Sequence, residues 1–173
     1  METKIYGKVI GQFYKCPTTR FHARGLARLI RASHTKVNQI LKTLAKHGLV
    51  RKASSKVAIE YEASLDSDNF HASKKLYNLA SLQKLTRFLA ERYGLPETIV
   101  LFGSYATGHD TETSDIDILI ITNKELNLNL KKFENELNRK ISIHEIKSLN
   151  TAKPEFINNL INGAVLYGYL KVL

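Results

Sequence analysis

Residues 101–119, LFGSYATGHDTETSDIDIL, predict the fold of the second half of the chain. An apolar strand over 98–102 ends in Gly103-Ser104, and after ten further residues an Asp-x-Asp pair opens a second strand over 115–121. Gly103 lets the backbone turn sharply and approach a phosphate without a Cβ clash. Ser104 opens a helix whose N–H groups and hydroxyl can bind triphosphate oxygens. The spacing therefore predicts a nucleotide-phosphate site after the first strand.

The two acidic residues of this motif have the spacing of a metal site. Asp115 and Asp117 are two apart on a strand, so both carboxylates lie on the same side. Hard oxygen ligands placed together suit Mg²⁺, which would bridge to the phosphates of ATP or another nucleoside triphosphate. Such an ion stabilises the leaving pyrophosphate and orients in-line attack at the α-phosphate. We therefore expect Asp115 and Asp117 to be both metal ligands and catalytic residues.

This arrangement resembles the signature of the polymerase-beta-like nucleotidyltransferases, over roughly residues 96–147. The resemblance implies a third acidic residue on the following strand, where it helps to bind metal and activate the acceptor hydroxyl. That position falls on Ser142, and serine cannot replace a carboxylate in either role. Strand alternation puts Glu145 on the opposite face. His144 shares the face of Ser142, where it is either a base or a structural residue.

Basic residues are concentrated in the first third of the chain. Residues 1–60 carry 13 Lys/Arg and 2 Asp/Glu, a balance of +11, whereas residues 95–173 carry 8 basic and 10 acidic residues, a balance of −2. A positive field focused in this way attracts a polyanion. The alternative is a solvated basic surface without a partner.

The first third also has the pattern of a small helical domain. Helices are expected over 4–14, 21–30 and 34–47, with Ser33 as the N-cap of the third and Gly48 after its end. Residues 49–61 alternate like a hairpin, with a turn at Ser54-Ser55. This order resembles the winged-helix-turn-helix family over residues 1–62. The resemblance implies binding of double-stranded DNA, with a winged helix used for protein contacts as the alternative.

The expected DNA contacts lie on the third helix and on the hairpin. Asn and Gln can bind an adenine edge, and lysine can bind guanine or phosphate. Basic residues of the wing are expected at phosphates or in the minor groove. The contact residues are Thr35, Lys36, Asn38, Gln39, Lys42, Arg51, Lys52 and Lys56.

The overall expectation is an α+β protein in three parts. A winged helix-turn-helix over 1–63 is followed by a connecting helix over 64–94 and a small mixed-sheet nucleotidyltransferase domain over 95–173. One long helix is expected over 70–93, with an apolar stripe suited to domain packing or to a homodimer. In the last part, helices are expected over 126–138 and 154–161, and strands over 140–146 and 164–170.

The composition fits a soluble globular protein. No apolar run is long enough to span a bilayer, the first residues show no signal-peptide pattern, and Cys16 is the single cysteine. We therefore expect a cytoplasmic protein that does not bind membranes.

Two functions from different classes follow. The whole chain resembles archaeal fusions of a winged helix to a minimal nucleotidyltransferase. In the first hypothesis it is a DNA-binding transcription regulator whose second domain binds a Mg-nucleoside triphosphate, which the serine at position 142 favours. In the second, it is an active nucleotidyltransferase that transfers a nucleoside monophosphate to a hydroxyl of a protein or small molecule, which the complete Gly-Ser and Asp-x-Asp motif favours.

Overall fold

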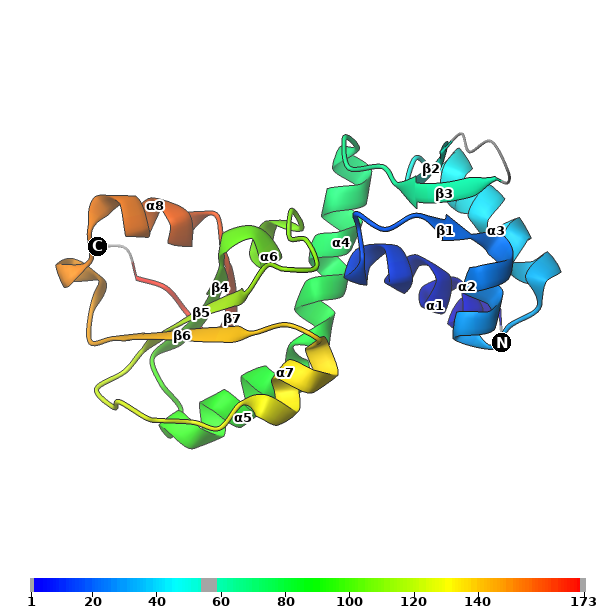
Figure 1. Cartoon of the computed structure of the whole chain (residues 1–173). Helices are drawn as coiled ribbons and strands as arrows, with labels where there is room; N and C mark the ends of the chain where they lie inside the picture. The colour runs from blue at the N-terminus through cyan, green and yellow to red at the C-terminus, as the bar shows by residue number, and fades with distance from the viewer. Residues whose placement is uncertain (1, 54–58, 172–173) are drawn as a thin grey trace. The chain divides into compact units, whose positions relative to one another are not determined.

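The computed structural model describes residues 2–53 and 59–171, which divide into two compact units, Met1–Lys74 and Lys75–Leu173. The fold is a mixed α+β arrangement with one small sheet in each unit (Figure 1). None of the helices described combines the length and the apolarity that crossing a bilayer requires.

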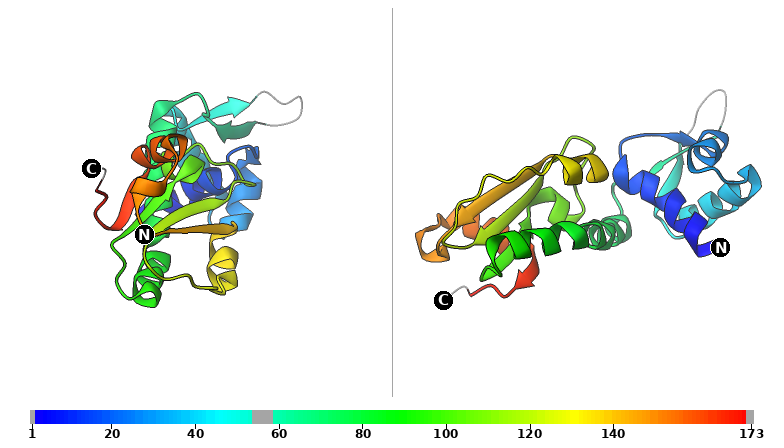
Figure 2. Two further views of the ribbon diagram at one scale, coloured as in Figure 1. Left: turned by 90° about the vertical axis from the view of Figure 1, so that its left-hand side faces the viewer. Right: turned by 90° about the horizontal axis from the view of Figure 1, so that it is seen from below.

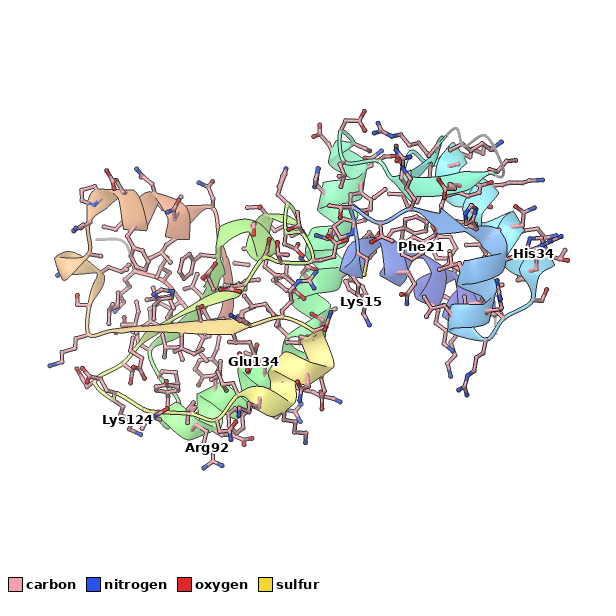
Figure 3. All side chains as sticks on the ribbon, viewed as in Figure 1. Lys15, Phe21, His34, Arg92, Lys124 and Glu134 are labelled. Carbon is pink, nitrogen blue, oxygen red and sulfur yellow. The ribbon has the colours of Figure 1, made fainter. Side chains whose placement is uncertain are left out.

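The first unit packs helices against a three-stranded antiparallel sheet of order β1-β3-β2. Its core is built on helical spacing, and Val9, Phe13, Val37 and Leu41 are fully buried. Phe21, labelled in Figure 3, is half-buried, and its ring meets that of the buried Phe13 edge to face at 5.1 Å between centroids. The elements are α1 (Glu2–Lys15), β1 (Phe21–His22), α2 (Ala23–Ile30), α3 (His34–Lys46), β2 (Val50–Ala53), β3 (Glu60–Ala63) and the start of α4 (Asp68–Ser81).

Two end signals of the third helix are confirmed. The Ser33 hydroxyl accepts a hydrogen bond from the Lys36 N–H at 3.3 Å, and Gly48 has a φ of +69° just after the helix. The expected helix over 21–30 is shorter, because Phe21 and His22 pair with Tyr61 and Glu60 as the strand β1. The expected turn at Ser54-Ser55 lies outside the described residues.

The second unit is a four-stranded mixed sheet of order β6-β5-β4-β7. β4 pairs in antiparallel fashion with β5 on one side and with β7 on the other, whereas β5 and β6 are parallel. The mixed sheet expected in this half is therefore confirmed. Its elements are α5 (Gln83–Tyr93), β4 (Thr98–Phe102), α6 (Gly103–Thr107), β5 (Ile116–Ile121), α7 (Lys131–Leu137), β6 (Ile141–Ile146), the 3-10 helix η1 (Leu149–Thr151), α8 (Pro154–Ile161) and β7 (Ala164–Gly168).

Helices cover both faces of this sheet (Figures 1 and 2). On one face, Ile99, Leu101 and Ile118 pack against buried residues of α5 such as Leu85 and Leu89, with α7 at the same core. On the other face, Val100, Phe102 and Leu119 pack against Leu160 of α8. Because the central strands β4 and β5 are buried on both sides, polar chemistry on these two strands is left to their ends.

The prediction of a single helix over 70–93 is wrong, because the structure has two helices that separate at Leu82. The Ser81 hydroxyl donates to the Asn78 carbonyl at 2.6 Å, and the Leu82 N–H bonds to Leu79 at 3.2 Å instead of to that carbonyl. A serine hydroxyl that competes for a helix carbonyl in this way offers the backbone an alternative to the regular ladder.

The helix expected over 126–138 begins five residues late, at Lys131. Leu126 and Leu128 pack on the core from an extended segment, and the Leu126 N–H donates to Glu145 at 2.9 Å. The Asn129 side chain accepts from the Lys131 N–H at 3.2 Å, an Asx turn that favours a helix start there. Glu134 (Figure 3) accepts from the Ile141 N–H at 3.1 Å and so joins α7 to β6.

Candidate functional site

The Gly-Ser turn lies where the buried strand β4 ends, and only glycine fits its first position. Gly103 has a φ of +74°, a left-handed conformation that side chains disfavour. A Cβ on Gly103 would stand 2.8 Å from Oδ2 of Asp117, closer than such atoms approach one another. The backbone of the turn and the carboxylate of the neighbouring strand are therefore in direct contact, because antiparallel pairing sets Phe102 opposite Asp117.

The Asp-x-Asp pair lies at the start of β5, as alternation requires. Ile116, Ile118 and Ile120 are fully buried in the core, whereas Asp115 is exposed and the side chain of Asp117 keeps 32% of its exposure. Desolvation raises the pKa of Asp117, and the charge of Asp115 raises it further, while His144 lowers it. The folded protein thus holds a carboxylate whose negative charge is poorly compensated by its surroundings, as expected of a group that binds a cation.

In the structure, as in the sequence, a serine occupies the position at which a third acidic residue was expected. Parallel pairing of β5 with β6 places Ser142 opposite Asp117. Nε2 of His144 lies 3.9 Å from Oδ1 of Asp117, and its ring packs edge to face on Phe102 at 5.3 Å between centroids. Sequence reasoning identified both neighbours of the Asp pair on this strand.

Glu145 does not supply the missing carboxylate. Its Oε1 accepts from the Tyr93 hydroxyl at 2.6 Å and from the Leu126 N–H at 2.9 Å, on the opposite side of β6. Burial and this carboxylate both raise the pKa of Tyr93. Within the described residues, no group of three or more His, Cys, Asp and Glu side chains could hold a metal ion.

The donor set nevertheless fits Mg²⁺. This ion is usually bound through one or two carboxylates, with waters and substrate phosphates completing its ligands. The Asp117 carboxylate lies next to the Gly103 turn, and Asp115, two residues before it, is close enough for its charge to raise the pKa of Asp117. These two residues would hold the ion, and a bound nucleotide would have to supply further oxygen ligands.

The sequence-predicted DNA contacts fall on one helix and one strand of the first unit. On α3, the side chains of Thr35, Gln39 and Lys42 are exposed, and those of Lys36 and Asn38 are half-buried. Arg51 and Lys52 are exposed on β2, and Lys56 lies outside the described residues.

The charge of Arg51 is already balanced by acidic neighbours. Its Nε bonds to Glu62 at 2.8 Å, and its Nη1 lies 3.2 Å from Asp66. Arg20 binds the second oxygen of Glu62 at 2.8 Å, and the hydrogen bonds from the two arginines lower the pKa of Glu62. These pairs could not be predicted from the sequence, because they depend on the register of β2 with β3, which sets Arg51 opposite Glu62.

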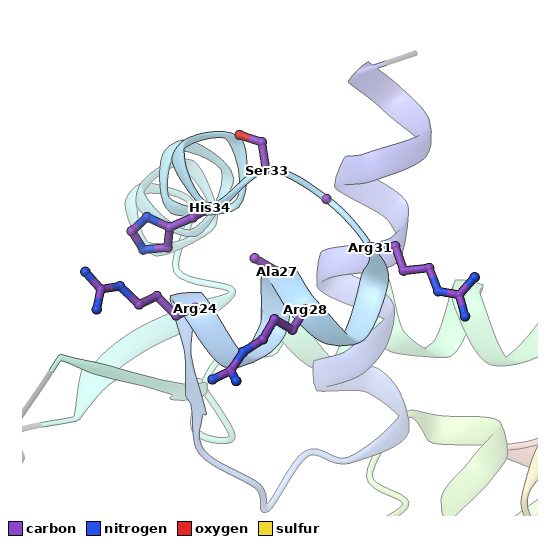
Figure 4. A pocket seen from close by; sticks show the side chains of 7 residues that line it. Arg24, Ala27, Arg28, Arg31, Ser33 and His34 are labelled. Carbon is purple, nitrogen blue, oxygen red and sulfur yellow. The ribbon is translucent and has the colours of Figure 1, made fainter.

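Sequence reasoning missed a basic pocket between α2 and α3. The pocket has a volume of about 640 Å³ and is lined by Arg24, Ala27, Arg28, Arg31, Ala32, Ser33 and His34. In Figure 4, Arg24 and Arg28 project from α2 on one side and Arg31 on the other. The signal was present as arginines four residues apart on a helix, Arg24 and Arg28, which share one face.

A mixed sheet with a glycine turn against a carboxylate pair on the next strand is typical of nucleotide-transferring domains. The family profile of the nucleotidyltransferase domain matches residues 82–167. A protein of Methanocaldococcus jannaschii that carries the name "Putative protein adenylyltransferase" is 34% identical over 88 residues, which cover 50% of this chain and 89% of that protein. The chain therefore belongs to the nucleotidyltransferase family. The match begins at Leu82, so it includes α5, which packs on the same core.

Proposed function

We propose that this chain transfers a nucleoside monophosphate from a Mg²⁺-bound nucleoside triphosphate to a hydroxyl group of a protein. The observation that carries the proposal is the contact between the Gly103 turn and the Asp117 carboxylate, which brings a phosphate-binding backbone and a metal-binding carboxylate together. Family membership and the name of the M. jannaschii relative support both the reaction and the class of acceptor.

The proposed reaction is a single displacement at phosphorus. The acceptor oxygen forms a bond to the α-phosphorus, the bond from that phosphorus to the bridging oxygen breaks, pyrophosphate leaves and one proton is released. Bound Mg²⁺ would neutralise charge on the phosphates. Gly103 admits the phosphates to the backbone, Ser104 offers its N–H and hydroxyl, and the two aspartates bind the ion. His144, beside Asp117, lines the same face as Ser142.

Calorimetric titration of each nucleoside triphosphate, with and without Mg²⁺, tests the proposal without knowledge of the acceptor. The wild type should bind at least one nucleotide in a magnesium-dependent way, and Asp115→Asn/Asp117→Asn should lose that binding because Ser142, opposite Asp117 on β6, offers no carboxylate in their place. The matched control is Glu125→Gln/Glu136→Gln, which removes two exposed negative charges elsewhere in the same unit and should bind as the wild type does. Wild-type protein that binds no nucleotide, or equal binding by the Asn variant, would refute the proposal.

A second function is favoured by the basic pocket. We propose that the first unit is a winged helix that binds double-stranded DNA, with α3 at the bases and Arg24 and Arg28 at phosphates. The chain order of two helices followed by two paired strands supports the winged-helix fold. Three arginines at one pocket support a polyanion as the partner. Together with nucleotide binding by the second unit, DNA binding would make the chain a nucleotide-responsive regulator. We also propose that the chain binds DNA as a homodimer, since winged helices often read paired half-sites.

The DNA proposal predicts an order of effects among arginines. Arg24→Ala/Arg28→Ala should weaken duplex binding and reduce the slope of log affinity against log salt by about two, because each phosphate contact adds about one. Arg51→Ala is the matched control and should have a smaller effect, because Glu62 and Asp66 already neutralise that guanidinium. Fluorescence anisotropy of the full chain with a labelled duplex over a salt series measures both. If Arg51→Ala weakened binding as much as the pair, the phosphate-binding surface would lie on the hairpin instead.

A further inference from the structure

A cluster of buried polar side chains lies beneath the loop that joins α6 to β5. It comprises Asn78, Asp110 and Arg139, of which Asn78 is 1% and Asp110 2% exposed. We infer that Asn78 and Asp110 are positioning residues that hold the Gly-Ser turn and the Asp-x-Asp strand in fixed relation. The inference rests on the nucleotide site proposed above.

A single side-chain amide connects both parts of the site. Nδ2 of Asn78 donates to the carbonyl of Tyr105 at 2.9 Å and to Oδ1 of Asp110 at 2.8 Å. Tyr105 follows Ser104 directly in α6, and Asp110 lies five residues before Asp115. The amide of Asn78 therefore joins the backbone of the phosphate turn to the loop that leads into the carboxylate pair.

The other end of the loop is fixed as well. The Thr111 N–H donates to the Ser114 hydroxyl at 2.9 Å, and the Ser114 N–H bonds back to the Thr111 carbonyl at 3.3 Å, which closes a tight turn just before Asp115. Asp110 and Asp115 are thus separated by a turn whose conformation is set locally. A displacement of Asp110 would be passed on to Asp115 with little chain in between to absorb it.

Arg139 connects this cluster to the third strand of the site. Its Nη2 lies 3.7 Å from Oδ2 of Asp110, with the two side chains only 3% and 1% exposed. The residue that follows it, Lys140, accepts a hydrogen bond at its carbonyl from the Ile116 N–H at 2.9 Å, immediately before β6 begins. The start of β6, with Ser142, is therefore held relative to the same buried carboxylate.

A contribution to stability does not explain why these buried side chains are polar. A buried charge pair contributes little or nothing beyond what apolar residues of similar volume would give, because desolvation offsets its attraction. A hydrogen bond, unlike an apolar contact, fixes the distance and direction of its partners. Functional groups must be held within about 0.5 Å to act together, which favours a polar link at this place.

Titration of Mg-ATP into the full chain tests the inference. Asn78→Leu and Asp110→Ala both break the link, and each should raise the Kd at least about tenfold, since small misplacements of binding groups are costly. Asp110→Asn keeps the volume of aspartate and an acceptor for Asn78 but loses the charge that faces Arg139, so its Kd should lie between those of the wild type and Asp110→Ala, whereas a purely volumetric role would leave the wild-type Kd. Leu89→Ala, in the fully buried core of α5, is the control: it should lower the thermal midpoint of unfolding and leave the Kd within about twofold.

The outcomes separate this inference from the proposed function. Wild-type protein that does not bind Mg-ATP or another Mg-nucleotide refutes the function itself. Wild-type protein that binds, together with unchanged binding in Asn78→Leu and Asp110→Ala, refutes the positioning role alone. So does an equal loss in Leu89→Ala, since any loss of stability would then suffice. Asn78→Leu removes no charge and carries the same test if the Asp110→Ala variant does not fold.

Discussion

Asp117→Asn should reduce label transfer from α-labelled ATP by at least about a hundredfold, because a metal-bound phosphate site contributes several kcal/mol to phosphoryl transfer. Asparagine has the shape of aspartate but cannot replace its charge, and Ser142 on the paired strand offers no substitute. The assay combines the full chain with α-labelled ATP and a cell extract that supplies acceptors, and it measures the label incorporated into protein. The expected result is incorporation that depends on Mg²⁺ in the wild type and is at least about a hundredfold lower in the variant.

A loss of folding would not explain this result. Desolvation raises the pKa of Asp117 in the folded state above its unfolded value, so the folded state binds this proton more tightly than the unfolded state does. Ionisation of the carboxyl therefore lowers the stability of the fold at pH values above the unfolded pKa. The neutral asparagine should therefore unfold at a midpoint no lower than that of the wild type near neutral pH. Label transfer that persisted in Asp117→Asn would show that the reacting site lies elsewhere on the chain.

The core of the candidate site could be predicted from sequence because its geometry is local. A glycine after an apolar strand and two acids two residues apart on the next strand need only the period of a strand and the freedom of glycine. The resemblance to the polymerase-beta-like family indicated Ser142 as the third position, and the pairing of β5 with β6 sets it opposite Asp117. The cap of Ser33 on α3 was predictable for the same reason, since it concerns residues three apart.

The features that sequence reasoning missed depend on partners far along the chain. Asp110, a polar residue in a loop, has the pattern of an exposed residue, and it is buried because Asn78, 32 positions earlier, and Arg139 meet it. Arg51 has the pattern of a DNA contact until the register of two strands sets Glu62 beside it. At the break at Leu82, one serine hydroxyl binds the Asn78 carbonyl, a bond that apolar periodicity does not register.

Gly103→Ala should impair nucleotide binding by displacing the Asp117 carboxylate. The new Cβ would stand 2.8 Å from Oδ2 and 3.7 Å from Cγ of Asp117, so the side chain has to move away from the turn. A left-handed conformation without glycine adds about 1–2 kcal/mol of strain to the folded state. We expect a lower free energy of unfolding in denaturant titration and a Kd for Mg-nucleotide raised at least about tenfold, since groups that act together tolerate little displacement.

Gly94→Ala separates these two effects. Gly94 has a φ of +68°, so alanine there has the same backbone strain, but its Cβ would meet Nζ of Lys124 at 2.6 Å, the end of a flexible and exposed side chain. Gly94→Ala should therefore lose a similar amount of stability and keep the wild-type Kd. If Gly103→Ala bound nucleotide as tightly as Gly94→Ala does, the contact between the turn and Asp117 would have no part in binding. A selective loss in Gly103→Ala would instead mean that the fit of glycine against Asp117 is a requirement of the nucleotide site and not of the fold.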